Sequence, residues 1–336
     1  MNEDDINYGQ LLNEYSKHPH DTAFKRIMSR KPILIPYLKL NLPPTLSKRC
    51  DWDKLELLPT DFLDEHYQER RCDLLVMVPY GKRALYIHVL FEAQRRHDPQ
   101  MGWRLLQYMM SIWQKIERDR KDEYKRQQKE KIPKAARISV YPLPAIVPMV
   151  FYNGKERWRT PTRFHHDEIV ETPPGMMRYT PKLDFLLSDL VRMQDEDWNR
   201  YVENTHTFHS MKIFRHAHAG EIVQAMDSML EYHRWLIQID PSLSSDLFTY
   251  GFHLVHKMPT EERKLKLILQ DKISKGEPMP TLLQKILDQG RQEGIQKGRD
   301  EEKRDMAQKM LQQGADIEFV QAVTNLSKEE ILALQK

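Results

Sequence analysis

The chain has 336 residues, of which 40% are hydrophobic and 30% are charged. This length and balance are typical of a globular protein with one large domain or two ordinary ones. The formal net charge of +3 is too small to indicate nucleic-acid binding by itself. Apolar runs long enough for a membrane span are absent, and the acidic start MNEDDINYGQ has no signal-peptide regions. We therefore expect a cytoplasmic protein that does not contact a membrane.

The sequence contains two cysteines, Cys50 and Cys72. A single pair in so long a chain is not a disulfide framework, and a reducing compartment fits it. Neither cysteine has a CxxC partner, so a zinc site is not expected.

The first predicted helix covers residues 20–28. Asp21, Phe24, Lys25 and Met28 fall at the i, i+3, i+4 and i+7 positions of one helical face. The proline-rich sequence that follows is interpreted as a linker. A short apolar stretch over residues 55–63 predicts a strand.

A β-hairpin is predicted next. Residues 72–78, CDLLVMV, and residues 84–94, ALYIHVLFEAQ, have the apolar, branched composition of buried strands, and PYGK between them is typical of a turn. Because the apolar runs are nearly continuous, we expect helices on both faces of this sheet.

The later elements are mostly helical by pattern. Residues 101–117 predict an amphipathic helix, and the charged stretch 118–131 is interpreted as its solvated extension, with an arm that contacts DNA as the alternative. Residues 138–152 predict a strand that ends in a turn at Asn153-Gly154. Residues 182–270 are expected to be helical. Three short helices are predicted from about residue 300, with Gly314 at the first helix end and a Ser327–Glu330 capping box.

Two carboxylates and one amide on the hairpin are candidates for chemistry. Asp73 opens the first strand, and Glu92 and Gln94 lie two residues apart on the second, so that they share a face. A hairpin centred between Lys82 and Arg83 would place Asp73 opposite Glu92, with Cβ atoms about 5 Å apart. Carboxylates this close repel each other unless a cation lies between them. Oxygen ligands of this kind suit Mg²⁺ or another hard divalent cation such as Mn²⁺ or Ca²⁺.

Such a site fits phosphodiester hydrolysis. A metal held by carboxylates stabilises charge on the phosphoryl group and lowers the pKa of bound water. A polar side chain two residues after the glutamate could orient that water, which is the role expected for Gln94.

The spacing of Asp73 and the Glu92-Ala93-Gln94 segment resembles the D…(D/E)xK core of PD-(D/E)XK nucleases, with glutamine in place of lysine. The chain is similar in this respect to the Rpn family of recombination-promoting nucleases, which carries the glutamine variant. Four more segments resemble that family in the same order: HDTAFK at residues 20–25, RLLQY at 104–108, VPMVFYNG at 147–154 and the tail from Lys309 onward. The resemblance covers roughly residues 18–160 and 285–332.

The resemblance implies an α/β fold with a mixed central sheet flanked by helices, and a metal-dependent DNA endonuclease. Asp73 and Glu92 would hold the metal, while Gln94 and Asp21 would complete the catalytic group. Lys25, Arg95 and Arg104 are the candidates for DNA contacts. A role in recombination and a role in defence against mobile DNA share this chemistry.

Other interpretations of the same residues stay open. Asp73 and Glu92 could form structural ion pairs with nearby arginines, Gln94 could be an edge hydrogen-bonding residue, and Asp21 could cap a helix. The rival function is a catalytically silent DNA- or protein-binding module that keeps the nuclease fold.

Three further patterns have both a functional and a structural interpretation. His216-Ala217-His218 resembles the His-hydrophobic-His motif of tyrosine transposases, but a continuous helix over residues 211–230 would separate the two histidines by about 200°. Gly290, Gly294 and Gly298 recur every four residues, which could let two helices approach in a homodimer or higher homo-oligomer. For the C-terminal helices, a docking module is favoured over a helix-turn-helix because no basic recognition helix is evident.

The expected organisation has four parts: a tail over residues 1–17, a nuclease domain over 18–200, a helical region over 201–285, and a C-terminal oligomerisation or docking segment over 286–336.

Overall fold

The computed structural model describes residues 8–60, 73–92, 98–164, 170–171, 173, 175–217, 221–256, 258–276, 284, 299–300 and 302–333. They fall into two compact units, residues 1–277 and 278–336. The strands are β1 (Glu56–Leu58), β2 (Asp73–Tyr80), β3 (Arg83–Glu92), β4 (Ala145–Tyr152) and β5 (Leu186–Asp189). The helices of the first unit are α1 (Tyr8–Lys17), α2 (Pro19–Met28), α3 (Lys31–Asn41), α4 (Pro44–Ser47), α6 (Met101–Lys129), α7 (Asp195–Val202), α8 (Thr205–His216), α9 (Ile222–Ile239), α10 (Pro241–His256) and α11 (Pro259–Ser274), with short 3₁₀ turns η2 (Trp52–Lys54), η3 (Lys134–Ala136) and η4 (Met177–Tyr179).

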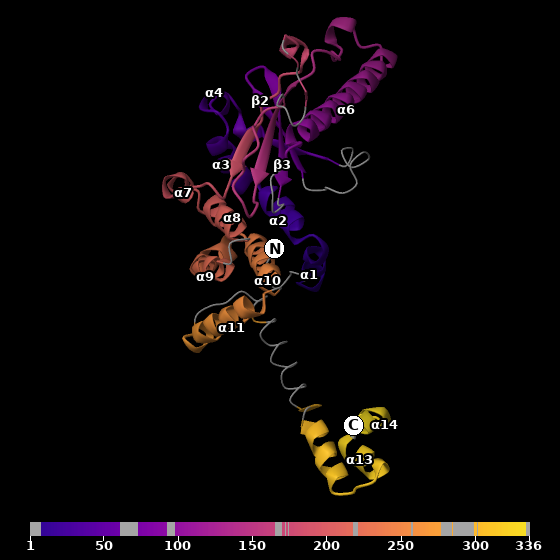
Figure 1. Cartoon of the computed structure of the whole chain (residues 1–336). Helices are drawn as coiled ribbons and strands as arrows, with labels where there is room; N and C mark the ends of the chain where they lie inside the picture. The colour runs from indigo at the N-terminus through magenta and orange to yellow at the C-terminus, as the bar shows by residue number, and fades with distance from the viewer. Residues whose placement is uncertain are drawn as a thin grey trace. The chain divides into compact units, whose positions relative to one another are not determined.

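The five strands form one mixed sheet in the order β1-β2-β3-β4-β5. The pairs β1–β2 and β2–β3 are antiparallel, whereas β3–β4 and β4–β5 are parallel. The long helix α6 provides the crossover between the parallel strands β3 and β4 (Figure 1). The predicted mixed α/β sheet is confirmed, and its carboxyl end collects the ends of β3, β4 and β5.

The β2–β3 hairpin closes on a two-residue turn, Gly81-Lys82, because Tyr80 pairs with Arg83. Gly81 has φ +60°, a left-handed conformation that glycine adopts without steric cost. Pro79 and Tyr80 were predicted to lie in the turn, but they pair within the strands. The hairpin centre is therefore one residue earlier than predicted, and the pairing register shifts by two residues.

Two helical layers cover the sheet (Figure 1). On one face, the α6 residues Leu105, Tyr108 and Ile112 pack in one cluster with Val150 and Tyr152 of β4. On the opposite face, the Phe151 ring meets Phe24 of α2 at 5.1 Å, Tyr37 of α3 at 5.6 Å and Phe214 of α8 at 5.5 Å between ring centroids. Burial on both faces explains the nearly continuous apolar strands.

The proline-rich segment after α2 is a helix and not the predicted linker. Pro32 lies in the first turn of α3, where its missing N–H has no helical partner to lose. Pro36 lies inside the helix, yet Ile33, Leu34, Tyr37 and Leu38 are fully buried. Tertiary burial of this apolar face outweighs the low helix propensity of proline.

Helix α6 runs to Lys129, so the prediction of a solvated helix extension over residues 118–131 is confirmed for its helical part. Lys115–Asp119 and Arg126–Glu130 are exposed ion pairs along it. The predicted strand over residues 138–152 begins only at Ala145. Residues 138–144 are instead held against α6. Arg120 of this helix donates to the carbonyls of Val140 and Pro142 at 3.1 and 2.7 Å.

Residues 182–270 are mainly helical as predicted, apart from strand β5. The single helix predicted over residues 211–230 is wrong, because α8 ends at His216 and α9 begins at Ile222. His216 lies at a helix end and pairs with Glu221 at 3.0 Å. His218 lies outside the described residues, as do Cys72 and the glycines at 290, 294 and 298.

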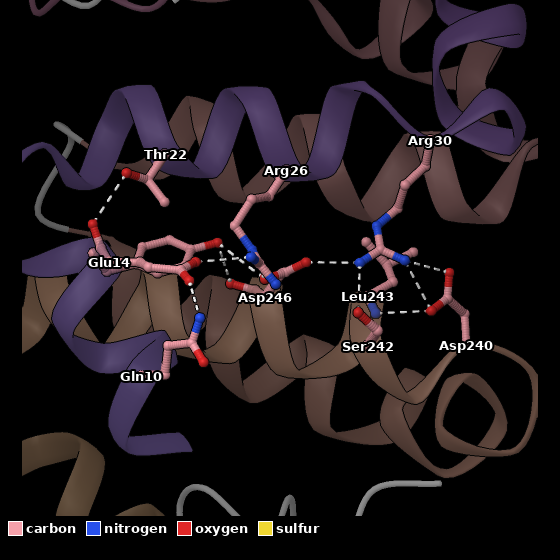
Figure 2. Close-up of polar contacts among 10 residues, drawn as sticks. Gln10, Glu14, Thr22, Arg26, Arg30, Asp240, Ser242, Leu243 and Asp246 are labelled. Atoms are coloured by element: carbon pink, nitrogen blue, oxygen red, sulfur yellow. Dashed lines mark hydrogen bonds and ion pairs between the residues drawn. The ribbon is translucent and has the colours of Figure 1, made fainter. Parts of the chain in front are cut away.

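An ionic network centred on the buried Asp246 joins α1, α2, the N-cap of α3 and α10 (Figure 2). The Asp246 carboxylate, whose side chain is 0% exposed, accepts from Arg26 at 2.6 Å and from Arg30 at 2.7 Å. Arg30 also pairs with Asp240 at 2.7 Å, and Arg26 with Glu14 at 2.8 Å. Burial raises the pKa of the adjacent Tyr15 well above its usual value, and the charge of Asp246 adds to the effect. The network therefore fixes α2, the helix that carries Asp21 and Lys25.

The C-terminal unit contains a helix over residues 302–312, α13 (Ile317–Thr324) and α14 (Lys328–Ala333). Gly314 has φ +85° and donates to Leu311, while Ala315 donates to Met310, which is the Schellman pattern at a helix end. Ser327 and Glu330 exchange the two hydrogen bonds of a capping box, 2.9 and 3.3 Å long. The predictions of the Gly314 helix end and of the Ser327–Glu330 capping box are confirmed. Across both units, no described helix has the length and apolar character needed to cross a membrane.

Candidate active site

The candidate site lies at the end of the sheet where the parallel strands terminate. Glu92 of β3 pairs with Tyr152 of β4, and Tyr152 pairs in turn with Asp189 of β5. Asp73 begins the antiparallel strand β2, so it lies at this same end. Three acidic positions from three strands thus lie at the same end of the sheet.

The register places Asp73 and Glu92 on the same face of the sheet. Asp73 pairs with Leu90, two residues before Glu92, so the predicted direct pairing of Asp73 with Glu92 is wrong by two residues. Because side chains alternate, a shift of two preserves the face. Leu75, two residues from Asp73, and Val150, the partner of Leu90, both pack in the α6 cluster. The two carboxylate positions therefore belong to the α6 face.

The diagonal relation between Asp73 and Glu92 suits a shared cation better than a direct carboxylate contact. Residues at such positions are roughly 7–8 Å apart on neighbouring strands. A hard cation binds carboxylate oxygens at about 2.1 Å for Mg²⁺, so it can bridge that gap. The donor set consists of carboxylates, the ligands that Mg²⁺ prefers, and it fits such an ion. Among the side chains that the structure describes, which exclude those of Asp73 and Glu92, no metal-ligating cluster forms.

Asp21 and Lys25 lie on α2, which packs on the other face of the sheet. Helix α2 packs through Phe24 on Phe151, the face opposite to the α6 cluster. Asp21 lies in the first turn of α2, while His18 occupies the N-cap position, so the alternative of a plain N-cap does not apply to Asp21. Lys25 is exposed to solvent.

The remaining predicted site residues fall in two groups. Gln94 and Arg95 lie outside the described residues. Arg104 is described, and its guanidinium pairs with Asp98 at 2.8 Å with only 13% of the side chain exposed. Asp98 also accepts from the Gln100 backbone N–H at 2.8 Å, so this pair joins the loop after β3 to the start of α6.

The segment after β4 is tightly built. The Tyr152 hydroxyl donates to the Glu156 carbonyl at 2.7 Å, and the ring crosses Gly154 so closely that a Cβ there would lie 1.9 Å from the hydroxyl oxygen. Trp158 packs edge-on against Tyr152 at 5.1 Å between centroids. The Asp189 carboxylate accepts from the backbone N–H groups of Trp158 and Val191, each at 3.0 Å. Asp189 therefore fixes the backbone of this segment. These hydrogen bonds explain why the Asp189 carboxylate is buried, without a catalytic role for it.

One residue of this segment was not among the predicted site residues. Asn153 follows Tyr152 and is 1% exposed, yet its side-chain nitrogen has no hydrogen-bond partner among the described residues. The sequence marked Asn153 only as part of a turn with Gly154, because burial without a partner depends on distant segments and leaves no local signal.

The arrangement defines a class: a mixed α/β protein whose five-stranded sheet brings acidic positions together at one end. Residues 18–241 match the family model described as "Putative transposase, YhgA-like", and residues 300–336 match the C-terminal helix-turn-helix domain of the Rpn/YhgA-like nuclease family. The chain belongs to this Rpn/YhgA-like family.

Individual relatives differ in their stated activity. The chain is 30% identical over 188 residues to the recombination-promoting nuclease RpnD of Escherichia coli O157:H7, covering 56% of this chain and 64% of RpnD. It therefore spans just under two thirds of the length of RpnD. Identity to the recombination-promoting nuclease RpnC of Escherichia coli K12 is 24%, with 82% of this chain and 83% of RpnC covered. The K12 protein RpnE, named inactive, is 24% identical over 93% of this chain and 96% of its own length. No solved structure matches.

The family model also bears on the C-terminal unit. The C-terminal helices were expected to form a docking module and not a helix-turn-helix, whereas the match describes a helix-turn-helix domain. Its last described helix, α14, carries Glu329 and Glu330 in the first turn. The helix-turn-helix description thus stands for this unit, while the acidic turn explains why no basic recognition helix was evident.

Proposed function

We propose that the chain is a divalent-metal-dependent DNA endonuclease with a PD-(D/E)XK core. The observation that carries the proposal is the register that puts Asp73 and Glu92 diagonally across β2 and β3, on one face at the end of the sheet. Membership of a family whose relatives include RpnD and RpnC, both named recombination-promoting nucleases, supports it.

Asp73 and Glu92 would hold a cation such as Mg²⁺. When bound, the ion supplies charge stabilisation for the phosphoryl group and a lower pKa for a coordinated water. Gln94, two residues beyond Glu92, would orient the attacking water, and Asp21 would assist from α2. The chain's own residues thus position the water and the phosphate for an in-line displacement.

DNA contacts would come from basic residues around the sheet end and from the C-terminal unit. Lys25 is exposed on α2 and is proposed to bind a phosphate together with Arg95. Arg104 would reach DNA only after leaving Asp98, so its first role is to hold the start of α6. The helix-turn-helix unit is proposed to add DNA affinity.

Cleavage of supercoiled plasmid by the purified full-length protein tests the function. We expect nicked and linear DNA to appear with Mg²⁺ or Mn²⁺, and no cleavage after treatment with chelator. Readdition of metal should restore cleavage, because the site would lose only its cation. Persistent failure to cut in either metal, with intact folding, would contradict the proposal.

A silent DNA-binding module is the second candidate, and one observation favours it. RpnE, named inactive, aligns with 93% of this chain, more than either relative named as a nuclease. A binding module would retard DNA in the presence of chelator and tolerate loss of Asp73 and Glu92. The endonuclease would bind DNA but lose cleavage with either substitution.

Assembly is proposed to depend on the C-terminal region. The spacing of Gly290, Gly294 and Gly298 would allow close approach of two helices, and a homodimer is the simplest symmetric product. We expect the full chain to have the mass of a dimer in solution and a chain lacking residues 285–336 to have that of a monomer. Light scattering measures both, and equal oligomeric states would refute this role.

A further inference from the structure

Asn153 is a buried polar residue whose side-chain donor is unused in the described structure. The residue is 1% exposed and its Nδ2 has no partner there. A buried amide without a hydrogen bond destabilises the fold, because its lost hydration is not replaced. A leucine would have almost the same shape without that penalty, so stability alone does not account for an asparagine.

The position of Asn153 is fixed by its neighbours. The segment is held on both sides, by the Tyr152 hydroxyl on the Glu156 carbonyl and by the Asp189 carboxylate on the backbone of Trp158 and Val191. The close crossing of Tyr152 over Gly154 leaves no space for a side chain at residue 154. Asn153 therefore stays at the sheet end as a prepositioned donor.

Two carboxylates belong to residues that pair with Tyr152, those of Glu92 and Asp189. Both oxygens of Asp189 already accept from backbone N–H groups, those of Trp158 and Val191, so Glu92 is the available acceptor. Glu92 pairs with Tyr152, the residue directly before Asn153. With strands about 4.8 Å apart and a rise of about 3.3 Å per residue, the two Cα atoms are about 6 Å apart, within side-chain hydrogen-bond reach. Because β4 ends at Tyr152, Asn153 lies beyond the last paired residue and is not bound to the alternation of strand side chains.

We infer that Asn153 is a positioning residue for the metal site, donating Nδ2 to the carboxylate of Glu92 and fixing the oxygen that faces the cation. The inference rests on the proposed metal-dependent function. Carboxylates that bind metals are themselves hydrogen-bonded, and loss of such a partner typically lowers metal affinity or activity about 10–100-fold.

Calorimetric titration of Mn²⁺ into the full chain, together with thermal melts without metal, tests the role. Asn153→Leu is expected to weaken Mn²⁺ binding about 10–100-fold while the metal-free protein melts at the wild-type temperature or above it. Asn153→Ala, which avoids any steric clash, should weaken binding equally. Thr249→Val is the matched control, because the Thr249 hydroxyl is also buried and has no partner among the residues that the structure describes, but lies on α10. The Mn²⁺ affinity of this variant should not change.

Coupling to Glu92 distinguishes positioning from an independent effect. In a Glu92→Gln background, adding Asn153→Leu should change Mn²⁺ affinity by less than about twofold, because residues in one hydrogen-bonded unit are not additive. Wild-type Mn²⁺ affinity in Asn153→Leu and Asn153→Ala, or full additivity with Glu92→Gln, would overturn the inference and leave the nuclease proposal intact. If the wild type itself binds no Mn²⁺, the proposed function fails as well.

Discussion

Glu92→Gln is expected to reduce plasmid cleavage by orders of magnitude while the protein remains folded. The substitution preserves the shape of the side chain and removes one negative charge from the proposed pair. Metal affinity should fall because the pair holds the cation. Without metal, the variant should melt at or slightly above the wild-type temperature, since the repulsion between Asp73 and Glu92 is gone.

The opposite pattern identifies a structural ion pair. If Glu92 served only to neutralise a neighbouring arginine, Glu92→Gln would melt lower than the wild type without metal and would cut DNA at an unchanged rate. Melts with and without Mg²⁺, recorded beside plasmid cleavage, separate the two readings.

Asp246→Ala is expected to destabilise the first unit by about 3 kcal/mol, the lower end of the range for removing one partner of a buried ion pair. Asp246 is fully buried between Arg26 and Arg30, and its loss leaves two guanidinium groups without their shared acceptor (Figure 2). Arg26 and Arg30 are 37% and 21% exposed and keep Glu14 and Asp240, which moderates the effect.

Denaturant unfolding followed by tryptophan fluorescence measures this effect selectively, because all six tryptophans lie between Trp52 and Trp235. The matched control is Asp271→Ala. Its ion pair with Lys275 is equally short, at 2.6 Å, but 58% and 61% of the two side chains are exposed, and such pairs contribute little. Equal midpoints for Asp246→Ala and Asp271→Ala would show that the network does not stabilise α2.

Elements with local signals were predictable from the sequence. The Gly314 helix end and the Ser327–Glu330 capping box depend only on hydrogen bonds between residues at most five positions apart. The β2–β3 hairpin and α6 were found because strong apolar patterns mark them. The hairpin register was not, because the turn was expected to centre between Lys82 and Arg83, whereas strand pairing extends through Tyr80 and Arg83.

Features that depend on distant contacts were missed. Helix α3 tolerates Pro36 because Tyr37 and Leu38 are buried against later helices and strands. Strand β5 has four residues and takes its shape from pairing with β4. Arg26 and Asp246 are 220 residues apart, and the unpartnered amide of Asn153 is visible only once the fold surrounds it. Asp73 and Glu92 could be predicted from the sequence as candidate site residues. Their diagonal register became known only from the strand pairing.

The rate of plasmid nicking in Mg²⁺, compared between Glu92→Gln and Glu56→Gln, tests the central claim most directly. Both substitutions remove one carboxylate charge from the same sheet, but Glu56 lies on strand β1 and is exposed. We expect wild-type cleavage for Glu56→Gln and a loss of orders of magnitude for Glu92→Gln. Equal cleavage by the two variants would contradict the assignment of Glu92 to a metal-dependent nuclease site.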